Sequence, residues 1–590
     1  MLIEASNNRK INIYMPTLEW IGKDKVKTHH QDVPYRVLEH QYGFRSDNSE
    51  DKSETHSGNM VIHGDNLEAL KALMPRYEGK IKCIYIDPPY NTGNEKWVYN
   101  DNVNHPKIKK WLGEIVGQQG EDLSRHDKWL CMMYPRLVLL RKLLAENGAI
   151  FISIDDNEYA TLKLLCDEVF GINNHIKTFI WRTEGHTDNQ DVITHIHEYI
   201  LCYAKSKDNI VIRDVVDPNI PADSKILRNF AENSITKNGD KNPPSIITLP
   251  KGFPCEIESL SLEKTEGIEA LYAETNESFI SRETSKKYKV SYPARFDDMI
   301  VENGLLAQEC RVYSGWMNLN KLQNFIQNNC KDIIEEKGTT LKFYLSKNGV
   351  IYYRRCGRTP HYIQSVLQNM GTTEVNKYML EGMKIKFDFP KPFELISFLL
   401  SIIADKHDIV LDSFAGSGTT AHSVLNLNKD GGNRKFILIE MEDYAHTVTA
   451  ERVKRVINGY GEGKKAIKGT GGEFDYYELG DRLFDDENLL NEKIEESKIR
   501  EYIYYTETRQ PLTRERKPDS KYLLDTTLDT GYYFYYERDQ ITTLNFDTLN
   551  IVIEKADNYV IYADVCTLPE KYMTDHNITF KKIPRDIKHF

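Results

Sequence analysis

The sequence predicts an α/β fold in which a mostly parallel sheet is covered by helices on both faces. The sheet is built from two halves, with a separate unit inserted between them. Apolar runs of strand length alternate with helix-length segments over residues 57–206 and again over 381–465, a pattern typical of buried parallel strands joined by helices. Between 207 and 380 this alternation is lost. The 590 residues also exceed what one core supports, so several domains are expected.

The first half of the predicted sheet follows an amino-terminal arm at 1–56. The arm runs into a polar segment at 43–58, which we interpret as a linker. Strands are expected at 59–65, 82–87, 149–155 and 197–205. The helices between them are expected over LEALKALMPRY, WLCMMYPRLVLLRKLLAE and TLKLLCDEVFG.

The second half begins with a helix over PFELISFLLSIIA, and a strand at 408–414 follows. A helix over TAHSVLNLN and a strand at 435–441 complete it. The tail at 466–590 is expected to form a small α+β domain. Its runs EYIYYTE, GYYFYYE and NYVIYAD are predicted as strands, because aromatic and β-branched side chains favour that conformation.

The composition narrows the class of protein. Apolar residues make up 40% and charged residues 28% of the chain, as in ordered globular proteins. No run approaches the roughly 20 apolar residues of a membrane span, and the first residues show no apolar signal core, so a cytoplasmic protein is expected. The nine cysteines lack a zinc-binding spacing. The net charge of −11 argues against a nucleic-acid binder, although a basic groove can coexist with an acidic whole.

A first candidate site is Asp87-Pro88-Pro89-Tyr90, directly after the predicted strand at 82–87. Ligands of open α/β sheets bind at the carboxyl ends of strands. Two prolines remove two N–H donors, so the loop offers acceptors, and these suit an exocyclic amine whose ring stacks on Tyr90. The alternative is a rigid loop in which Asp87 only caps a turn.

A second candidate site is the glycine-rich turn between the strand at 408–414 and the next helix. It comprises Asp412, Ser413, Phe414, Gly416, Ser417 and Gly418. Such a turn leaves helix N–H groups free for a polar ligand, but it lacks the third glycine of a dinucleotide loop and the lysine of a P-loop. Glu440 ends the following strand, where an acid can accept hydrogen bonds from ribose hydroxyls. The alternative is a tight turn followed by an exposed glutamate.

Other features have weaker signals. His195 and His197 could suggest a metal, but no third ligand is in sight, so we interpret them as structural and expect no metal. In the insert, Asn348-Gly349 predicts a hairpin. Aromatic and basic residues on and around it suit contacts with DNA phosphates and base edges, and the alternative is a solvated hairpin. The candidate DNA-binding residues are Lys342, Lys347, Tyr352, Arg354, Arg355 and Arg358.

These motifs together resemble the amino-methyltransferases of DNA. DPPYNTG at 87–93 is similar to the catalytic motif of that family and DSFAGSGTT at 412–420 to its cofactor motif. The catalytic motif comes first, which marks the beta subgroup. The resemblance implies a circularly permuted Rossmann-like sheet with a target-recognition insert. It is nearest to the modification (Mod) subunit of type III restriction-modification systems, through MPTLEWIGKDKV, HGDNLEALKAL, KIKCIYIDPPYNTGNE, DKWLCMMYPRL, FISIDDNE and ITFKKIPRDI.

The resemblance also implies a role for each site residue. Asp87 and the Pro88 carbonyl would hold the N6 amine of an adenine that has left the duplex, and Tyr90 would stack on it. Residues of the glycine-rich turn would line the methionine end of S-adenosylmethionine and Glu440 its ribose. The remaining cofactor contacts implied are Asp65, Asn66, Lys391 and Pro392.

The partners implied are double-stranded DNA, a second copy of the chain and a helicase-nuclease (Res) subunit. A solitary adenine methyltransferase without a nuclease would carry the same motifs and stays open. A cytosine amine as target is disfavoured because that chemistry more often accompanies serine at the position of Asp87. A non-catalytic DNA-binding subunit also stays open, although both motifs are intact.

Overall fold

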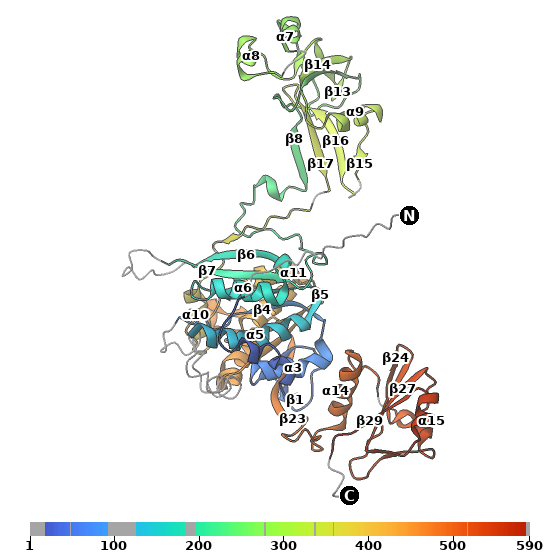
Figure 1. The fold of residues 1–590 in the computed structure, drawn as a ribbon. Helices are drawn as coiled ribbons and strands as arrows, with labels where there is room; N and C mark the ends of the chain where they lie inside the picture. The colour runs from blue at the N-terminus through green and yellow to red at the C-terminus, as the bar shows by residue number, and fades with distance from the viewer. Residues whose placement is uncertain are drawn as a thin grey trace. The chain divides into compact units, whose positions relative to one another are not determined.

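The computed structural model describes residues 18–585, apart from 48, 93–124, 184–194, 276–278, 336–337, 358 and 516. It divides into two compact units (Figure 1). The first comprises residues 1–213 and 364–590, and the second residues 214–363. Within the described residues, no helix has the length and apolar character needed to cross a membrane.

A mixed sheet of eleven strands organises the first unit. Its order is β18-β6-β7-β5-β4-β19-β20-β3-β23-β1-β2. Neighbours from β5 to β23 pair in parallel, whereas β7 is antiparallel to both β5 and β6. The strands are β1 (Arg36–Arg45), β2 (Glu50–Asp51), β3 (Met60–His63), β4 (Ile81–Ile86), β5 (Leu144–Ile154), β6 (His175–Arg182), β7 (His197–Ala204), β18 (Val366–Leu367), β19 (Ile409–Asp412), β20 (Lys435–Glu440) and β23 (Glu473–Arg482).

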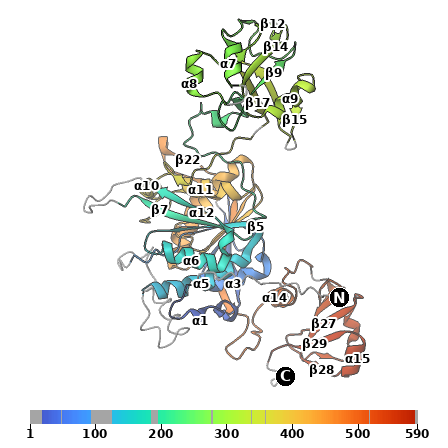
Figure 2. The same cartoon turned by 45° about the horizontal axis from the view of Figure 1, so that its top comes forward.

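Helices cover both faces of this sheet, as predicted (Figures 1 and 2). On one face, α5 (Arg125–Leu143) packs against α3 (Asn66–Tyr77) and α6 (Tyr159–Phe170). On the other, α12 (Thr419–Leu427) packs against α11 (Phe393–Ile403) and α13 (Glu451–Asn458). The short helices α1 (Lys23–Val26) and α2 (His29–Asp32) contact α5. Every strand and helix predicted for the two halves is therefore present.

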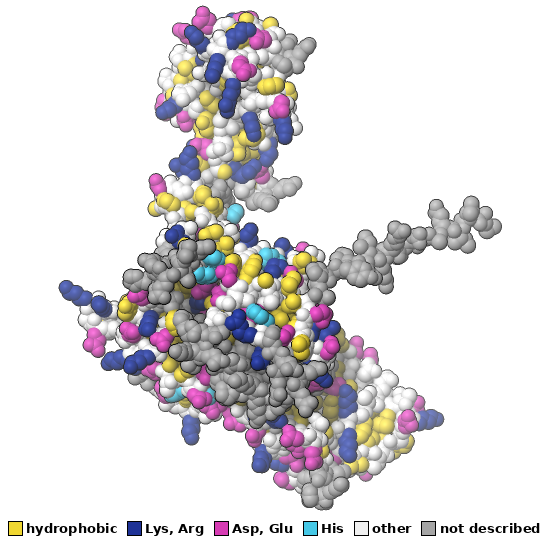
Figure 3. Space-filling model, turned by 60° about the vertical axis from the view of Figure 1, so that its left-hand side comes forward, with side chains coloured by type: hydrophobic (Ala, Val, Ile, Leu, Met, Phe, Trp, Pro, Cys, Tyr) yellow, Lys and Arg dark blue, Asp and Glu magenta, His cyan; other side chains and the backbone are white. Residues whose placement is uncertain are grey.

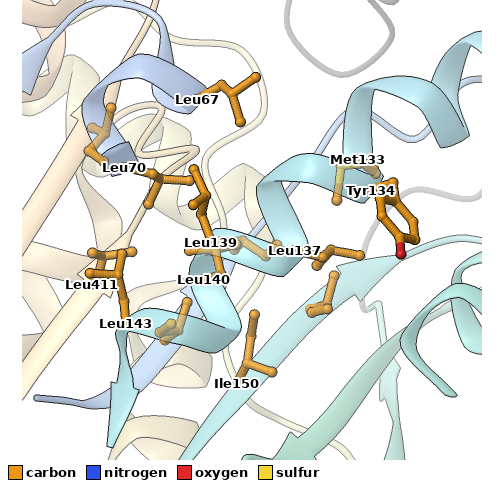
Figure 4. Packing of buried hydrophobic residues seen from close by; sticks show 14 of the residues in the cluster. Leu67, Leu70, Met133, Tyr134, Leu137, Leu139, Leu140, Leu143, Ile150 and Leu411 are labelled. Carbon is orange, nitrogen blue, oxygen red and sulfur yellow. The ribbon is translucent and has the colours of Figure 1, made fainter. Parts of the chain in front are cut away.

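The main hydrophobic core lies between the sheet and the helices of the first face. Helix α5 carries apolar residues nearly all round, because it lies between the sheet and two other helices. Figure 4 shows leucines of α3 and α5, among them Leu70 and Leu140, in one cluster with Ile150 of β5. All three side chains are fully buried. This packing supports the strands whose ends carry the candidate site.

The pairing of β4 with β19 brings the two candidate motifs together. Cys83 pairs with Val410 and Ile84 with Leu411, in parallel. Because parallel strands end at the same edge of a sheet, the loops that follow β4 and β19 lie side by side. The strand β20, which ends in Glu440, pairs with the other side of β19.

The inserted unit is smaller than predicted, since it spans 214–363 rather than 207–380. The difference at its end arises because β18 pairs in parallel with β6, which joins residues after 363 to the large sheet, and α10 (Thr373–Gly382) follows. The unit contains β8 (Phe230–Ser234), β9 (Pro244–Leu249), β10 (Leu260–Leu262), α7 (Ile268–Thr275), α8 (Arg282–Lys287), β11 (Ala294–Arg295), β12 (Met299–Glu302), β13 (Leu305–Leu306), β14 (Cys310–Gly315), α9 (Leu319–Gln327), β15 (Ile333–Ile334), β16 (Thr340–Leu345) and β17 (Ile351–Cys356).

The arm and the tail both differ from the prediction at their junction with the sheet. Residues 36–45, expected within the arm and its linker, form β1, which pairs with β23 from the expected tail domain. This pairing buries Phe44 and Phe474, which accounts for strand formation in an otherwise polar segment. The two-stranded pair β21 (Gly459–Tyr460) and β22 (Ile467–Lys468) precedes β23.

The run EYIYYTE was predicted as a strand, and that prediction is wrong. It lies in helix α14 (Glu496–Thr508). Ile499, Ile503 and Tyr504 recur at helical spacing and are buried in one cluster, so packing outweighs the strand preference of the tyrosines.

The other two tyrosine-rich runs of the tail form strands, as predicted. GYYFYYE contributes to β25 and NYVIYAD to β27. These two strands pair in parallel within a four-stranded sheet of order β24-β25-β27-β29. The strands of the tail after α14, and its short helix α15, are β24 (Leu523–Thr527), β25 (Thr530–Phe534), β26 (Thr543–Leu544), β27 (Asn558–Ala563), β28 (Val565–Cys566), α15 (Glu570–Asp575) and β29 (Ile578–Lys582).

Candidate active site

The loop after β4 is held rigidly by its surroundings. The indole N–H of Trp129, a fully buried residue of α5, donates to the Pro89 carbonyl at 2.6 Å. Asn91 adopts a left-handed φ of 60°, and its side-chain amide donates to Glu158. The two prolines between these anchors fix φ at their own positions. The Asp87 carboxylate is therefore presented from a loop with little conformational freedom.

A buried lysine joins the catalytic motif to two carboxylates. The Nζ of Lys391 lies 2.8 Å from Oε2 of Glu198 and 3.4 Å from Oδ1 of Asp87. It also donates to the Tyr90 hydroxyl at 2.7 Å. That hydroxyl lies 2.9 Å from Asp87 and 2.8 Å from Glu198. These four side chains form one cluster, which we call the charge cluster.

The electrostatics of the charge cluster follow from burial and the lysine. Burial raises the pKa of Asp87 above its ordinary value, Lys391 opposes this rise, and Glu198 adds to it. Burial disfavours the charge on Lys391, but the two carboxylates keep the pKa of the lysine above its usual value. Asp87 is thus a buried acceptor whose ionisation depends on a neighbouring cation.

The structure places the side chain of Lys391 with the catalytic motif, although the sequence assigned it to the cofactor. Its backbone still meets the glycine-rich turn, because the Thr419 hydroxyl lies 3.3 Å from the Lys391 carbonyl. Its ammonium group also lies 4.7 Å from the centre of the Tyr90 ring, so one face of that ring is already covered. Pro392 is the residue before α11.

The sequence analysis did not identify Glu198 as a site residue. It is the second residue of β7. The signal present in the sequence is an acidic residue in the otherwise apolar run of a strand predicted to be buried. A charge in such a place requires a partner, but that partner, Lys391, lies 193 positions away.

The glycine-rich turn is tied to strands on both sides. Asp412 accepts from the backbone N–H of Phe414 at 3.0 Å and from the Thr420 hydroxyl at 2.6 Å, and burial raises the pKa of Asp412 to about 7. On the other side, Glu440 accepts from the backbone N–H of Gly416 at 2.7 Å. The turn is therefore fixed where its two ends meet the sheet.

Glycine is required in this turn by the backbone itself. Gly416 has a φ of 54° and Gly418 a φ of 80°, in the left-handed region that other residues rarely adopt. A Cβ atom at Gly418 would lie 3.0 Å from the Thr449 carbonyl. Helix α12 begins at Thr419, and no side chain caps its amino terminus. Its first N–H groups are thus available to a ligand.

Asp65 and Asn66 lie at the same edge, after β3. Asp65 caps helix α3 by accepting from the N–H of Leu67 at 2.8 Å. The Asn66 amide donates to the Ser413 carbonyl at 3.0 Å, and the buried Arg136 bonds to Asn66 in turn. Asn66 therefore supports the glycine-rich turn directly, whereas the contact of Asp65 with a ligand stays a prediction.

The described residues contain no group of three His, Cys, Asp or Glu side chains that could hold a metal ion. His195 lies 3.2 Å from Asp156, and His197 lies 3.0 Å from the Tyr199 hydroxyl. Both histidines thus take part in local contacts.

In the inserted unit, the predicted hairpin is present, because β16 and β17 pair in antiparallel across a turn at Gly349. Its arginines are engaged, however. Arg354 donates to Glu232 at 2.6 Å and lies 4.7 Å from the Phe230 ring, and Arg355 bonds to Glu335. Hydrogen bonds from Lys321 and Arg355 lower the pKa of Glu335 to about 2.

The other candidates in this unit are placed differently. Lys342 pairs with Arg354 across the hairpin, Tyr352 stacks on Tyr344 at 6.1 Å, and Lys347 is exposed in the turn. Arg358 lies outside the described residues. Lys and Arg side chains are spread over the face of the inserted unit seen in Figure 3.

Residues 81–451 match the model of a protein family described as DNA methylase (N6_N4_Mtase). The match takes in the inserted unit and both loops at the sheet edge, and it covers more than half of the chain. The chain belongs to this DNA methylase family. The predicted membership among DNA amino-methyltransferases is confirmed.

Curated relatives include Mod subunits of type III restriction-modification enzymes. The chain is 29% identical to the EcoP15I Mod subunit of Escherichia coli over 72% of its own length and 64% of that protein. It is 32% identical to the EcoPI Mod subunit of Escherichia phage P1, over 76% of its own length and 66% of that protein. It is also 30% identical to the type II methyltransferase M.KpnI of Klebsiella pneumoniae, over 70% and 87% of the two chains. The chain thus spans less than two thirds of the length of either Mod subunit.

Solved structures similar to the chain include M1.HpyAVI and the PvuII DNA methyltransferase, which is cytosine-N4-specific. The former is 13% identical, with a TM-score of 0.26, over 67% of this chain and 98% of its own. The latter is 12% identical, with a TM-score of 0.27, over 67% and 86%.

The predicted cofactor, S-adenosylmethionine, is confirmed by the family. The residues present fit it. The uncapped amino terminus of α12 suits a carboxylate, the positive φ angles of Gly416 and Gly418 bring backbone close to a ligand, and the acid Glu440 ends the adjacent strand, where a ribose is held in related folds.

The glycine-rich turn yields a testable prediction. Gly416→Val should lower the affinity for S-adenosylmethionine by at least about tenfold, because a β-branched residue strongly disfavours a φ of 54° and displaces the N–H that Glu440 holds. Isothermal titration calorimetry measures the affinity. Gly431→Val is the matched control, since Gly431 has a φ of 81° with open space around it. Equal affinities for the two variants would contradict the placement of the cofactor at this turn.

Proposed function

We propose that this chain transfers a methyl group from S-adenosylmethionine to the N6 amine of adenine in DNA, as the Mod subunit of a type III restriction-modification system. The observation that supports it most directly is the juxtaposition of the acceptor loop 87–90 with the glycine-rich turn at one edge of the sheet. Asp87 at the first position of the acceptor loop favours adenine over cytosine.

Methyl transfer requires little of the protein beyond the correct placement of the amine and the methyl group. When bound, S-adenosylmethionine supplies an electrophilic methyl group on a positively charged sulfur. The Asp87 carboxylate and the Pro88 carbonyl accept hydrogen bonds from the amine, which leaves its lone pair directed at the methyl group. The amine nitrogen becomes cationic as the bond forms, and a carboxylate whose pKa is raised by burial is suited to receive the proton that it then loses.

The order of the elements supports a circularly permuted sheet. The strand bearing the glycine-rich turn, β19, lies at the centre of the parallel strands but comes after β3, β4 and β5 in sequence. Under this proposal, residues 57–206 form the catalytic half and 381–465 the cofactor half of one methyltransferase domain. The arm at 1–56 and the tail at 466–590 contribute the strands β1 and β23 to its sheet. The inserted unit is the target-recognition domain.

The partners proposed are double-stranded DNA, a second copy of the chain and a Res helicase-nuclease, and the tyrosine-rich tail is a candidate contact surface. A second candidate function is a solitary adenine methyltransferase. The observation that favours it is coverage, since the matched region spans 87% of M.KpnI, described as a type II methyltransferase, but 64% of the EcoP15I Mod subunit. Recovery of a helicase-nuclease with the affinity-purified chain from its host decides between the two.

Mass analysis of nucleosides from treated DNA tests the proposed reaction. We expect N6-methyladenine from the unaltered chain and none above background from Asp87→Ala. DNA binding should be nearly unchanged, because under this proposal the amine is the one group of the DNA that the carboxylate contacts. Asp156→Ala, which removes an exposed carboxylate after the neighbouring strand β5, should methylate normally. Methylcytosine as the product, or full activity of Asp87→Ala, would contradict the proposal.

The charge cluster predicts opposite pH effects for two variants. Lys391→Met removes the charge that lowers the pKa of Asp87, so the acid limb of the kcat profile should move to higher pH. Glu198→Gln removes a charge that raises the same pKa, so its acid limb should move to lower pH. The measurement is kcat for DNA methylation across pH at saturating cofactor and DNA. Shifts in the same direction would show that Asp87 does not control the profile.

The hairpin of the inserted unit gives a prediction for DNA reading. The double variant Arg354→Ala, Arg355→Ala should weaken DNA binding. Loss of a phosphate contact would flatten the salt dependence by about one counterion, whereas loss of a base contact would relax one position at about 1–3 kcal/mol. Matched and mismatched duplexes titrated at several salt concentrations separate these cases. As controls, Glu232→Gln and Glu335→Gln free the arginines and should raise affinity. Unchanged affinity, salt slope and site choice would place the reading element elsewhere.

A further inference from the structure

An arginine without a carboxylate lies beneath the glycine-rich turn. Arg452, on helix α13, is fully buried. Its guanidinium donates to the Ser417 hydroxyl at 2.8 Å and to the Thr419 hydroxyl at 2.7 Å, and its other amino group lies 3.2 Å from Nδ1 of His422. Within the described part of the chain, no Asp or Glu oxygen lies within ion-pair distance of it, and its Nε has no hydrogen-bond partner.

This environment is costly for a cation. Burial lowers the pKa of Arg452 to about 9, and Tyr460 and Glu394 act on it only from a distance. His422 supplies no counter-charge, because an imidazole is either neutral or cationic. Burial and Arg452 itself lower the pKa of that imidazole well below its ordinary value, so it is neutral beside the arginine. Buried charges in proteins are normally paired. Arg434, in the same half of the domain, follows that rule through Asp430 at 3.1 Å.

The hydroxyls that hold Arg452 point toward a use for its charge. Ser417 and Thr419 accept from the guanidinium, so each must direct its own proton elsewhere. The partners present are 3.3 Å away, namely the other hydroxyl for Ser417 and the Lys391 carbonyl for Thr419. Both residues border the amino terminus of the nine-residue helix α12, which has no side-chain cap. The buried Arg452 guanidinium therefore lies next to two hydroxyl groups with long hydrogen bonds, those of Ser417 and Thr419. Both hydroxyls lie at the uncapped amino terminus of α12.

An acid lies on the other side of the turn. Glu440 ends the strand β20 and accepts from the backbone N–H of Gly416, whereas the Asp412 carboxylate is bonded to the Thr420 hydroxyl of α12. An anionic group of a ligand is repelled by Glu440 and attracted to the α12 terminus. The carboxylate of the methionine moiety is the anionic group of S-adenosylmethionine.

We infer that Arg452 is a positioning residue for the cofactor, which acts through the hydroxyls of Ser417 and Thr419 to hold the methionine carboxylate at the amino terminus of α12. The inference rests on the proposed function. It adds the origin of the charge that binds the methionine carboxylate. The bound carboxylate supplies the negative charge near Arg452 that no Asp or Glu among the described residues provides at ion-pair distance.

Two ligands that differ only at the amino-acid end test this inference. S-adenosylhomocysteine carries the carboxylate, and 5′-methylthioadenosine lacks the whole amino-acid group. In Arg452→Met, which keeps most of the side-chain volume, affinity for S-adenosylhomocysteine should fall by about tenfold or more, while affinity for methylthioadenosine stays within about twofold. Calorimetry on the full-length chain measures both. Equal losses for the two ligands would show a structural role only, and no loss for either would also overturn the inference.

A second experiment changes the ligand and leaves the protein unaltered. The methyl ester of S-adenosylhomocysteine has no carboxylate charge, so the unaltered chain should bind it about tenfold or more less tightly than the free acid. Arg452→Met should discriminate much less, because the two changes remove the same interaction. An equal ester penalty in both proteins would overturn the inference. Ser417→Ala should reproduce part of the selective loss and serves if Arg452→Met does not fold.

Arg434→Met is the matched control, since it removes a buried arginine that has its own carboxylate. Any effect on affinity should be the same for both ligands, and a loss confined to S-adenosylhomocysteine would overturn the assignment to Arg452. Failure of the proposed function has a different signature. In that case nucleosides from treated DNA contain no N6-methyladenine, or the unaltered chain binds neither S-adenosylhomocysteine nor S-adenosylmethionine. Failure of this inference leaves methylation and cofactor binding by the unaltered chain intact, and only the ligand selectivity of the loss in Arg452→Met is absent.

Discussion

The parallel pairing of β4 with β19 is the constraint on which the candidate site depends. It sets the acceptor loop and the glycine-rich turn beside each other, although the inserted unit separates them in sequence. Chain closure costs little more as an insertion lengthens, so a whole folding unit can enter between the halves. The sheet then needs only the correct strand neighbours, and the large core around α3 and α5 holds those neighbours in place.

Lys391 and Arg452 are buried cations near this edge, and their charges are compensated differently. Lys391 has two carboxylates within reach, so its burial is compensated inside the protein. Arg452 has hydroxyls and a neutral imidazole, so its compensation is incomplete until an anion binds. Since desolvation of a charge costs several kcal/mol in proteins, an unpaired cation stores free energy that a ligand can recover. The first cation sets the protonation of Asp87, and the second sets the attraction for a carboxylate.

Local signals in the sequence located six strands of the sheet (β3, β4, β5, β7, β19 and β20), the helices between them and both loops, because each depends on residues that are neighbours in the chain. Contacts between residues far apart in the sequence could not be predicted from these local signals. Glu198 gains its place through a lysine on the other half of the domain, and residues 36–45 form a strand because β23 supplies their partner. The helix over EYIYYTE forms because Ile499, Ile503 and Tyr504 share one buried face, and strand propensity of single residues does not contain that information. The contacts of individual residues with cofactor and DNA remain predictions.

Carboxylates of the inserted unit pair with the arginines of its hairpin. The hairpin arginines that suit DNA are already bound to Glu232 and Glu335. The guanidinium of Arg354 also lies 4.7 Å from the centre of the Phe230 ring and 5.0 Å from that of the Tyr344 ring. A DNA group must displace a carboxylate to reach either arginine, which reduces the net gain from any single phosphate. A base edge that offers two acceptors in the plane of the guanidinium replaces a bidentate carboxylate more completely than one phosphate oxygen does. Under the proposed function, internal pairing therefore weakens indiscriminate binding more than recognition of the correct site.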